Sequence, residues 1–556
     1  MMRKLLMLAV LGLVALGNSS VFAATTRWVN KTDLTPTPPG TSCANAGYMT
    51  ISAAVGAATS GDTIEVCPGI YPELVMVDKT LTFLGPQQGV DARTRTVPAT
   101  SEAVVGAPDG AFQIEADKVV IDGFTIQDVV NNPSAPPFTG LGAGIWTNPG
   151  FSGTEGGHQI FNNIIQANIV GIYLNNTCTL GTLVQFNLIR DNTVPGASSG
   201  NGIYSDVGLC KAVINENKFS GNSTGSVSVF GPPFTPNTTD DISVTNNELV
   251  APSPESISFV GVSNSTIDGN ISTGSTNDAT VHLFGNDSKV MVTNNRLLNG
   301  NRAIVVDNPL SIYGVGPNSD ITAHLNCIQG NSVAGMEVDP FAYSTPSLDA
   351  ENNWWGSSSG PTNPNNPTGT GDRIIALQNN VDFTPWLPTA PTGCPQVPNT
   401  PGKATGGGKI ESDPTSLDLV LELATLLIKK SFDPTIVGSQ ATFGFVVTCC
   451  APTRNLEYND HQANVRIKAI SIETFVISAP SLACPTTSGK HAQFKGQANE
   501  TTVTGTQQVG FTVDVDDCGE PGSSTPGGTD MFKIQTFDYM AGGPLIGGNI
   551  QIQPAQ

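Results

Sequence analysis

Two aspartates at equivalent positions of neighbouring sequence repeats are the residues best placed to do chemistry. Asp307 and Asp339 each follow a short segment in which apolar residues alternate with other residues. Two carboxylates held close together can split their pKa values and act as the acid and base of a glycosidase, or they can share a Ca²⁺ ion. His282 and Glu337 lie in the middle of such segments and complete the candidate catalytic set. A row of solvated turn aspartates is the alternative interpretation.

Aromatic residues occupy the same place in earlier segments. Trp146, Tyr173 and Tyr204 each lie between small or apolar residues, so they are expected to point outward from a strand. Asn175 and Asp206 follow at the adjacent turn position. Aromatic faces stack on sugar rings and polar groups bond their hydroxyls, so these five residues are the candidate substrate-binding residues. The whole predicted outward row is Trp146, Tyr173, Tyr204, Ser228, Ser258, His282, Val305 and Glu337.

These positions belong to a repeat of varying length. An asparagine within an apolar pattern recurs at Asn163, Asn187, Asn217, Asn247, Asn270, Asn295, Asn326 and Asn353. The outward row advances along the chain together with these asparagines. Each repeat holds strands too short to bury themselves alone, so successive repeats must stack as coils with parallel strand pairing. Asparagine suits the bends because it tolerates the left-handed backbone region, and stacked asparagine side chains can bond one another.

The chain from about Cys43 to Leu387 resembles the right-handed parallel β-helix proteins of the pectin-lyase-like superfamily. The residues that carry the resemblance are Ile51 to Val55, Gly61 to Ile64, the asparagine ladder, and Asn352 to Gly356. The resemblance implies the fold, whereas members of this fold class include lyases, hydrolases, epimerases and adhesins. A short helix within residues 50–60 is expected to cover the open end of the stack.

The two ends of the chain differ from the repeats. Residues 1–23 have the charge and apolar pattern of a secretory signal, and the β-helix is predicted to occupy residues 24–387. A proline-rich linker at 388–402 precedes a predicted β-sandwich at 403–556, with strands at 441–448, 464–477, 491–497, 509–515 and 531–538. Residues 417–428 fit either a helix or a strand.

This C-terminal part is similar to the post-COAP type of β-domain found at the end of many secreted bacterial proteins. The matching residues include Gly402 to Gly408, Ala441 to Phe445 and Asn455 to His461. The resemblance implies an accessory module. Asp460, His461, Asp516 and Asp517 could hold a metal, but turn-forming polar residues are the favoured interpretation.

Charge and cysteine content restrict the partners and the compartment. The formal net charge of −21 disfavours nucleic acid and acidic membrane surfaces as partners. The ten cysteines of a chain with a predicted signal favour disulfides, and Cys43–Cys67 and Cys178–Cys210 are the expected pairs. The pairing among Cys449, Cys450, Cys484 and Cys518 stays open. These features predict an extracellular, cell-surface or periplasmic protein without membrane insertion after signal cleavage.

Three functions remain in competition. The first is binding of extracellular polysaccharide or cell-surface glycan along the outward row. The second is a polysaccharide lyase or glycoside hydrolase that uses the carboxylates of that row, and the absence of Arg and Lys from the row disfavours an anionic substrate. The third is a structural or adhesive surface protein without catalysis. Ca²⁺ is the candidate cofactor.

Overall fold

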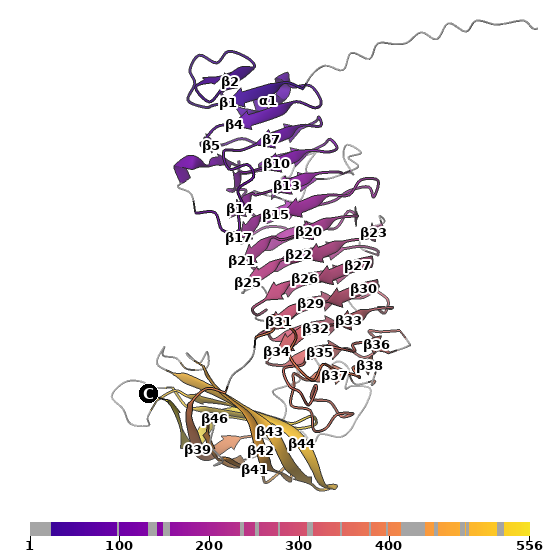
Figure 1. Ribbon diagram of the computed structural model, residues 1–556, viewed down its shortest axis with the longest axis vertical. Helices are drawn as coiled ribbons and strands as arrows, with labels where there is room; N and C mark the ends of the chain where they lie inside the picture. The colour runs from indigo at the N-terminus through magenta and orange to yellow at the C-terminus, as the bar shows by residue number, and fades with distance from the viewer. Residues whose placement is uncertain are drawn as a thin grey trace, which may run out of the picture.

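The computed structural model describes residues 24–96, 99–131, 142–147, 156–233, 238–250, 255–275, 278–308, 315–344, 347–376, 378, 380–395, 399–412, 440–449, 454–478, 484, 489–519 and 528–555. The chain winds into a tall stack of parallel coils, and an antiparallel β-domain lies at the far end of the stack (Figure 1). The predicted fold class is confirmed for the β-helix. The predicted signal at 1–23 and the ambiguous segment at 417–428 lie outside the described residues.

Three parallel sheets form the walls of the stack. Sheet 1 contains β1 (Thr26–Val29), β4 (Thr63–Val66), β7 (Thr82–Leu84), β10 (Val120–Asp122), β13 (Gln159–Phe161), β16 (Leu183–Gln185), β19 (Leu209–Cys210), β20 (Val213–Asn215), β23 (Thr239–Asp240), β24 (Ser243–Thr245), β27 (Ser263–Asp268), β30 (Ser288–Thr293), β33 (Thr322–His324), β36 (Leu348–Asp349) and β38 (Val381–Asp382). Sheet 2 contains β5 (Gly69–Tyr71), β8 (Ala103–Val105), β11 (Thr125–Ile126), β14 (Ile164–Gln166), β17 (Leu188–Arg190), β21 (Lys218–Ser220), β25 (Glu248–Val250), β28 (Ile271–Ser272), β31 (Arg296–Leu298) and β34 (Cys327–Gln329). Sheet 3 contains β6 (Val75–Val77), β9 (Phe112–Ile114), β12 (Ala143–Thr147), β15 (Val170–Tyr173), β18 (Asn201–Ser205), β22 (Gly225–Phe230), β26 (Glu255–Val260), β29 (Ala279–Leu283), β32 (Arg302–Val306), β35 (Ala334–Val338) and β37 (Ile374–Ala376).

The inward side chains of the three sheets build one continuous apolar core. On sheet 3, Ile145 pairs in register with Ile172 on the next coil, and Ile172 pairs with Ile203 on the coil after that. All three are completely buried. Because strand side chains alternate, this stacking of aliphatic residues sends the residue after each isoleucine to the opposite face of sheet 3.

The asparagine ladder runs through the stack as a chain of buried side-chain hydrogen bonds. Asn187 Nδ2 donates to Asn217 Oδ1 over 3.0 Å, and Asn217 Nδ2 donates to Asn247 Oδ1 over 3.1 Å. The same bond links every adjacent pair from Asn163 to Asn353. A second, shorter ladder links Asn168, Asn192 and Asn222. The predicted stacking of asparagines at the bends is therefore confirmed.

The left-handed backbone conformation lies one residue before each ladder asparagine. Asn162, Phe186 and Glu216 have φ values of 52°, 59° and 52° and precede Asn163, Asn187 and Asn217. The sequence interpretation assigned this conformation to the ladder asparagines themselves, which is wrong. The ladder position requires asparagine because its amide both donates and accepts, not because its backbone is left-handed.

A short helix covers the N-terminal end of the stack, as predicted. Helix α1 (Ile51–Ala57) begins at Thr50, whose side chain accepts from the Ala53 amide over 3.1 Å. Its buried face consists of Ile51, Ala54 and Val55, and it lies against β1, β4 and β6. A short antiparallel pair, β2 (Gly40–Ser42) and β3 (Asn45–Ala46), and the 3₁₀ turn η1 (Ala99–Ser101) complete this end.

The C-terminal domain is a closed antiparallel barrel, which corrects the predicted sandwich. Its strands are β39 (Gly402–Glu411), β40 (Gln440–Thr448), β41 (Arg454–Asp460), β42 (Val465–Ser478), β43 (Lys490–Thr502), β44 (Gly505–Asp517), β45 (Met531–Gln535) and β46 (Met540–Pro554). Strand β39 pairs with both β40 and β46, so the sheet closes on itself. Sequence alternation predicts the strands, but it does not predict the pairing of β39 with β46 that closes the barrel, which we call the barrel seam. Strands of sandwiches and barrels alternate in the same way.

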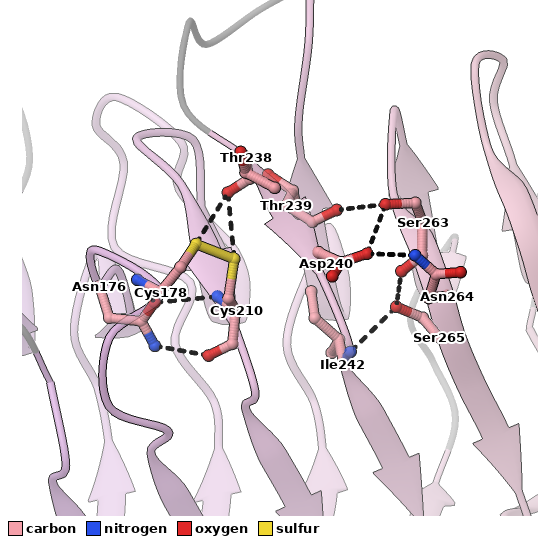
Figure 2. Close-up of a disulfide and its surroundings, with 10 residues drawn as sticks. All are labelled: Asn176, Cys178, Cys210, Thr238, Thr239, Asp240, Ile242, Ser263, Asn264 and Ser265. Atoms are coloured by element: carbon pink, nitrogen blue, oxygen red, sulfur yellow. Dashed lines mark hydrogen bonds between the residues drawn. A yellow bond between two sulfur atoms is a disulfide. The ribbon is translucent and has the colours of Figure 1, made fainter.

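Disulfides join segments within the stack and within the barrel. The expected pairs Cys43–Cys67 and Cys178–Cys210 are present, and Cys327–Cys394 and Cys484–Cys518 are further pairs. Figure 2 shows Asn176 beside Cys178–Cys210, where its Oδ1 accepts from the backbone amides of both cysteines. These bonds fit an oxidising compartment.

Several hydrogen bonds join the barrel to the last coils. Arg373 donates to the Phe537 carbonyl over 2.6 Å, and the Gly510 amide donates to the Pro367 carbonyl over 2.7 Å. Lys495 Nζ lies 3.8 Å from the buried Asp372 carboxylate. Among the described residues, no helix is long and apolar enough to cross a membrane.

Candidate functional site

The predicted outward row exists as one register line on sheet 3. Trp146 pairs with Tyr173, Tyr173 with Tyr204, and Tyr204 with Ser228. The line continues through Ser258, His282, Val305 and Glu337. Residues separated by more than 150 positions in the sequence therefore share one face, with neighbouring rungs about 4.8 Å apart.

The aromatic end of this row is buried, contrary to the expectation of an exposed face. Trp146 is 3% and Tyr173 is 5% exposed, and Tyr204 is half-buried. The ring centroids are 5.6 Å apart for Trp146 and Tyr173 and 5.9 Å apart for Tyr173 and Tyr204. The rings lie tilted against one another along the coil axis, at interplanar angles of 32° and 34°, and Ile169 and Val170 pack beside them. Their faces are thus occupied by protein.

Asp206 holds the two tyrosine hydroxyls. Tyr173 donates to its Oδ1 over 2.5 Å and Tyr204 donates to its Oδ2 over 3.2 Å. Burial, with smaller contributions from this carboxylate, raises the pKa of both phenols, that of Tyr204 to about 12. Asn175 is fully buried and accepts from Ser205 and from the Val207 amide. Asp206 therefore holds the tyrosine pair in place, and Asn175 joins its own turn to the next coil.

The other end of the row gathers the predicted catalytic residues. Asp307 follows β32 and Asp339 follows β35, which are adjacent strands of sheet 3. His282 Nε2 on β29 lies 3.4 Å from Asp307 Oδ2. His282 is 2% exposed, whereas both aspartates are only partly buried. The arrangement leaves two carboxylates in reach of solvent above a buried imidazole.

The two aspartates are electrostatically different. Burial raises the pKa of Asp339 to about 7, and the nearby carboxylates of Asp307 and Glu337 add to this rise. His282 and Arg302 oppose it without cancelling it. A carboxyl group with such a pKa can carry a proton near neutral pH and is suited to general acid catalysis.

Glu337 has a partner that sequence reasoning missed. Arg302 at the start of β32 forms a short hydrogen-bonded ion pair with Glu337 on β35. The sequence interpretation found no Arg or Lys in the outward row, and Arg302 lies three residues before Val305, outside that row. Its side chain nevertheless reaches the row from the adjacent rung. Glu337 is 6% exposed and its carboxylate is paired with Arg302. It is therefore suited to holding the Arg302 side chain in position.

A buried carboxyl group beneath the cluster was also missed. Asp287 is completely buried, and its Oδ1 accepts from the Val262 amide over 2.8 Å. Burial raises the pKa of Asp287 to about 8, and the His282 charge works against this rise. Asp287 lies outside both asparagine ladders, at another bend of the coil, where its backbone amide donates to Asn318 Oδ1.

Among the described residues, no group of three or more His, Cys, Asp or Glu side chains is arranged to hold a metal ion. The predicted Ca²⁺ thus stays an expectation based on Asp307 and Asp339 alone. Of the four residues considered for a metal in the C-terminal domain, Asp460 accepts from Tyr539 and from two turn amides.

No protein-family model matches this sequence, and comparison with curated proteins gives no match. Similar solved structures include a DFA-IIIase from Arthrobacter chlorophenolicus A6 without its lid, at 14% identity and TM-score 0.32, covering 65% of this chain and 99% of that chain. Tailspike protein 2 of bacteriophage CBA120, its enzymatically active domain, has 11% identity and TM-score 0.26 over 91% of this chain and 73% of that one. The tailspike protein gp49 of the Acinetobacter baumannii bacteriophage Fri1, a capsular polysaccharide depolymerase, has 11% identity and TM-score 0.30 over 89% and 84%. At these scores the likenesses carry no argument about function.

Proposed function

We propose that the protein binds an extracellular polysaccharide at the His282 end of sheet 3 and hydrolyses its glycosidic bonds. The observation that carries the proposal is the pair Asp307 and Asp339 on adjacent strands, with the pKa of Asp339 raised to about 7. Adjacent rungs are about 4.8 Å apart. Carboxyl groups on strands this close can adopt the roughly 5 Å separation found in retaining glycosidases.

In this proposal each group has one role. Asp339 gives its proton to the glycosidic oxygen as the bond from that oxygen to the anomeric carbon breaks. Asp307, held beside His282, attacks the anomeric carbon and forms a glycosyl ester. A water molecule then displaces Asp307 and returns a proton to Asp339. Glu337 and Arg302 keep the cluster in position through their ion pair.

The test measures release of reducing ends from a panel of neutral and acidic polysaccharides. Asp339→Asn and Asp307→Asn are each expected to lower kcat by about 10²-fold or more, because acid–base and nucleophilic groups contribute on that scale. The rate is also expected to fall as the pH rises through about 7, because Asp339 then loses its proton.

The matched control is Asp241→Asn, an exposed aspartate with a φ of 57° that asparagine tolerates. It should leave the rate unchanged. Full hydrolysis by the Asp307→Asn, Asp339→Asn double variant would exclude this pair. Products with an unsaturated end would instead indicate a lyase.

A further inference from the structure

A cavity lies between the last coils of the β-helix and the outer face of the barrel. It has a volume of about 310 Å³ and is lined by residues of both domains, and we call it the junction cavity. Ligand sites often form at such domain boundaries. The charged lining residues are Asp372 and Arg373 from the β-helix and His491, Lys495, Asp514 and Lys533 from the barrel.

Strand pairing places several barrel residues of the junction cavity side by side. Asp514 on β44 pairs directly with Gln493 on β43 and with Lys533 on β45. The next residue along β45, Ile534, is buried in the barrel core. Because side chains alternate along a strand, Lys533 points out of the barrel, where it lines the cavity.

The carboxylates that line the cavity already have partners within the protein. Asp372 is 4% exposed and accepts from the amide and from the side chain of Asn331, both over 2.8 Å. Asp514 accepts from Gln493 over 2.8 Å and lies 3.4 Å from His491. Both carboxylates are therefore held by donors of the fold itself.

His491 adds a positive charge to the cavity wall. Its two ring nitrogens lie 2.9 Å from Asp516 and 3.4 Å from Asp514. Burial lowers the pKa of His491, but the hydrogen bonds with these two carboxylates outweigh burial and raise this pKa to about 9. The imidazole is therefore protonated at neutral pH and offsets one of the two carboxylate charges.

The other cations of the cavity are short of partners. Among the described residues, the Lys533 ammonium has neither an ion-pair nor a hydrogen-bond partner. Lys495 Nζ has the Asp372 carboxylate alone, at 3.8 Å. The Arg373 guanidinium donates one hydrogen bond, to the Phe537 carbonyl, so its remaining nitrogens still have donors to offer.

The carboxylates around Arg373 do not fully compensate its charge. Burial lowers the pKa of Arg373, although the charges of Asp538 and Glu337 act in the opposite direction. Four cationic side chains thus line the cavity against two carboxylates, in a chain whose formal net charge is −21. A ligand with negatively charged oxygens would supply the acceptors that these donors lack.

We propose that the junction cavity is an anion-binding site, which holds a sulfate, phosphate or carboxylate group between Arg373 of the β-helix and Lys495 and Lys533 of the barrel. The ligand is either a free small anion or an anionic group carried by a glycan chain. Because the donors come from both domains, a bound anion would also strengthen the junction. Asp307 and Asp339 do not line this cavity, so the proposal does not depend on hydrolysis at sheet 3.

The test measures binding to the full chain by isothermal titration calorimetry. Sodium sulfate, citrate and dextran sulfate are the probes, and sodium chloride at matched ionic strength and uncharged dextran are the blanks. At least one probe is expected to bind, and neither blank is. Binding of sulfate or citrate identifies a free small anion as the ligand, whereas binding of dextran sulfate alone identifies an anionic group on a glycan.

Lys533→Gln is expected to weaken that binding by about tenfold or more, the scale of one charge-assisted hydrogen bond. Lys533→Arg should keep the binding because it keeps the charge. Lys409→Gln is the matched control, since Lys409 is exposed on β39 and does not line the cavity. This control and the Asp307→Asn, Asp339→Asn double variant should bind the anion as the wild type does.

Absence of binding by all three probes, or unchanged binding by Lys533→Gln, would overturn the proposal. Equal weakening by Lys533→Gln and Lys409→Gln would also overturn it, because a general loss of positive charge would then explain the effect. Hydrolysis of a neutral polysaccharide is measured in parallel. Anion binding without hydrolysis would support this site and count against the catalytic pair on sheet 3, and the reverse result would do the opposite.

Discussion

At the scale of single residues, two carboxyl groups with raised pKa values give the cluster on sheet 3 its character. Asp339 and Asp287 both have raised pKa values, but Asp339 reaches solvent and Asp287 does not. A buried carboxyl group that keeps its proton in the folded state and loses it in the unfolded state makes stability depend on pH. Asp287 therefore makes the free energy of unfolding depend on pH, and this effect can be measured separately from catalysis.

We predict that Asp287→Asn stabilises the protein at pH 8. The pKa of Asp287 is about 8 in the folded state against an ordinary aspartate value of 3.8, so folded molecules hold more protons between these values. Stability must then fall as pH rises from about 4 to about 8. Asparagine keeps an oxygen for the Val262 amide without titrating. The melting temperatures of both proteins at pH 4, 6 and 8 check this. The same change of melting temperature with pH in wild type and variant would contradict the prediction.

At the scale of elements, the asparagine ladder fixes how each coil sits on the next. Asn217 is fully buried, donates to Val184 and Asn247, and accepts from the amide and side chain of Asn187. A buried polar group that loses its partner costs about 1–3 kcal/mol. One ladder residue thus satisfies groups on both neighbouring coils.

We predict that Asn217→Ala lowers the free energy of unfolding by about 3 kcal/mol or more, because several buried partners lose their bonds at once. Chemical denaturation measures the change. Asn45→Ala, at an exposed residue of β3, is the control, expected within about 0.5 kcal/mol of wild type. Equal effects of the two substitutions would show that the ladder bonds add nothing.

The same element shows what the sequence can predict. Regular asparagines and alternating apolar residues locate the rungs, because parallel stacking permits one register for them. Exposure of Trp146 and Tyr173 was mispredicted because alternation gives the face of a residue and not what covers it. Arg302 was missed because its position precedes the alternating segment, and the barrel seam was missed because β39 and β46 come from opposite ends of the domain.

At the scale of the whole molecule, a close backbone contact joins the two domains. The Gly510 amide on β44 donates to Pro367, and a Cβ atom at Gly510 would lie 2.0 Å from the Gly369 carbonyl oxygen. Backbone cannot yield as a flexible side chain can. Any side chain here must move the barrel or the last coil.

We predict that Gly510→Ala loosens the junction without unfolding either domain. Hydrogen exchange should rise in residues 360–374 and around β44 and stay unchanged in β12 to β29. Gly444→Ala, which meets open space, is the control. Unchanged exchange at the junction would show that the domains do not depend on this contact.

The barrel seam has a consequence for how the protein matures during synthesis. Each coil of the β-helix pairs with its immediate successor, so it can settle as soon as the next few dozen residues emerge. Strand β39 instead cannot complete its pairing until β46, at the other end of its domain, has been synthesised. A nascent chain that stalls before β46 would therefore carry a folded β-helix attached to an open sheet with unpaired strand edges, and that intermediate is the form most in need of a chaperone.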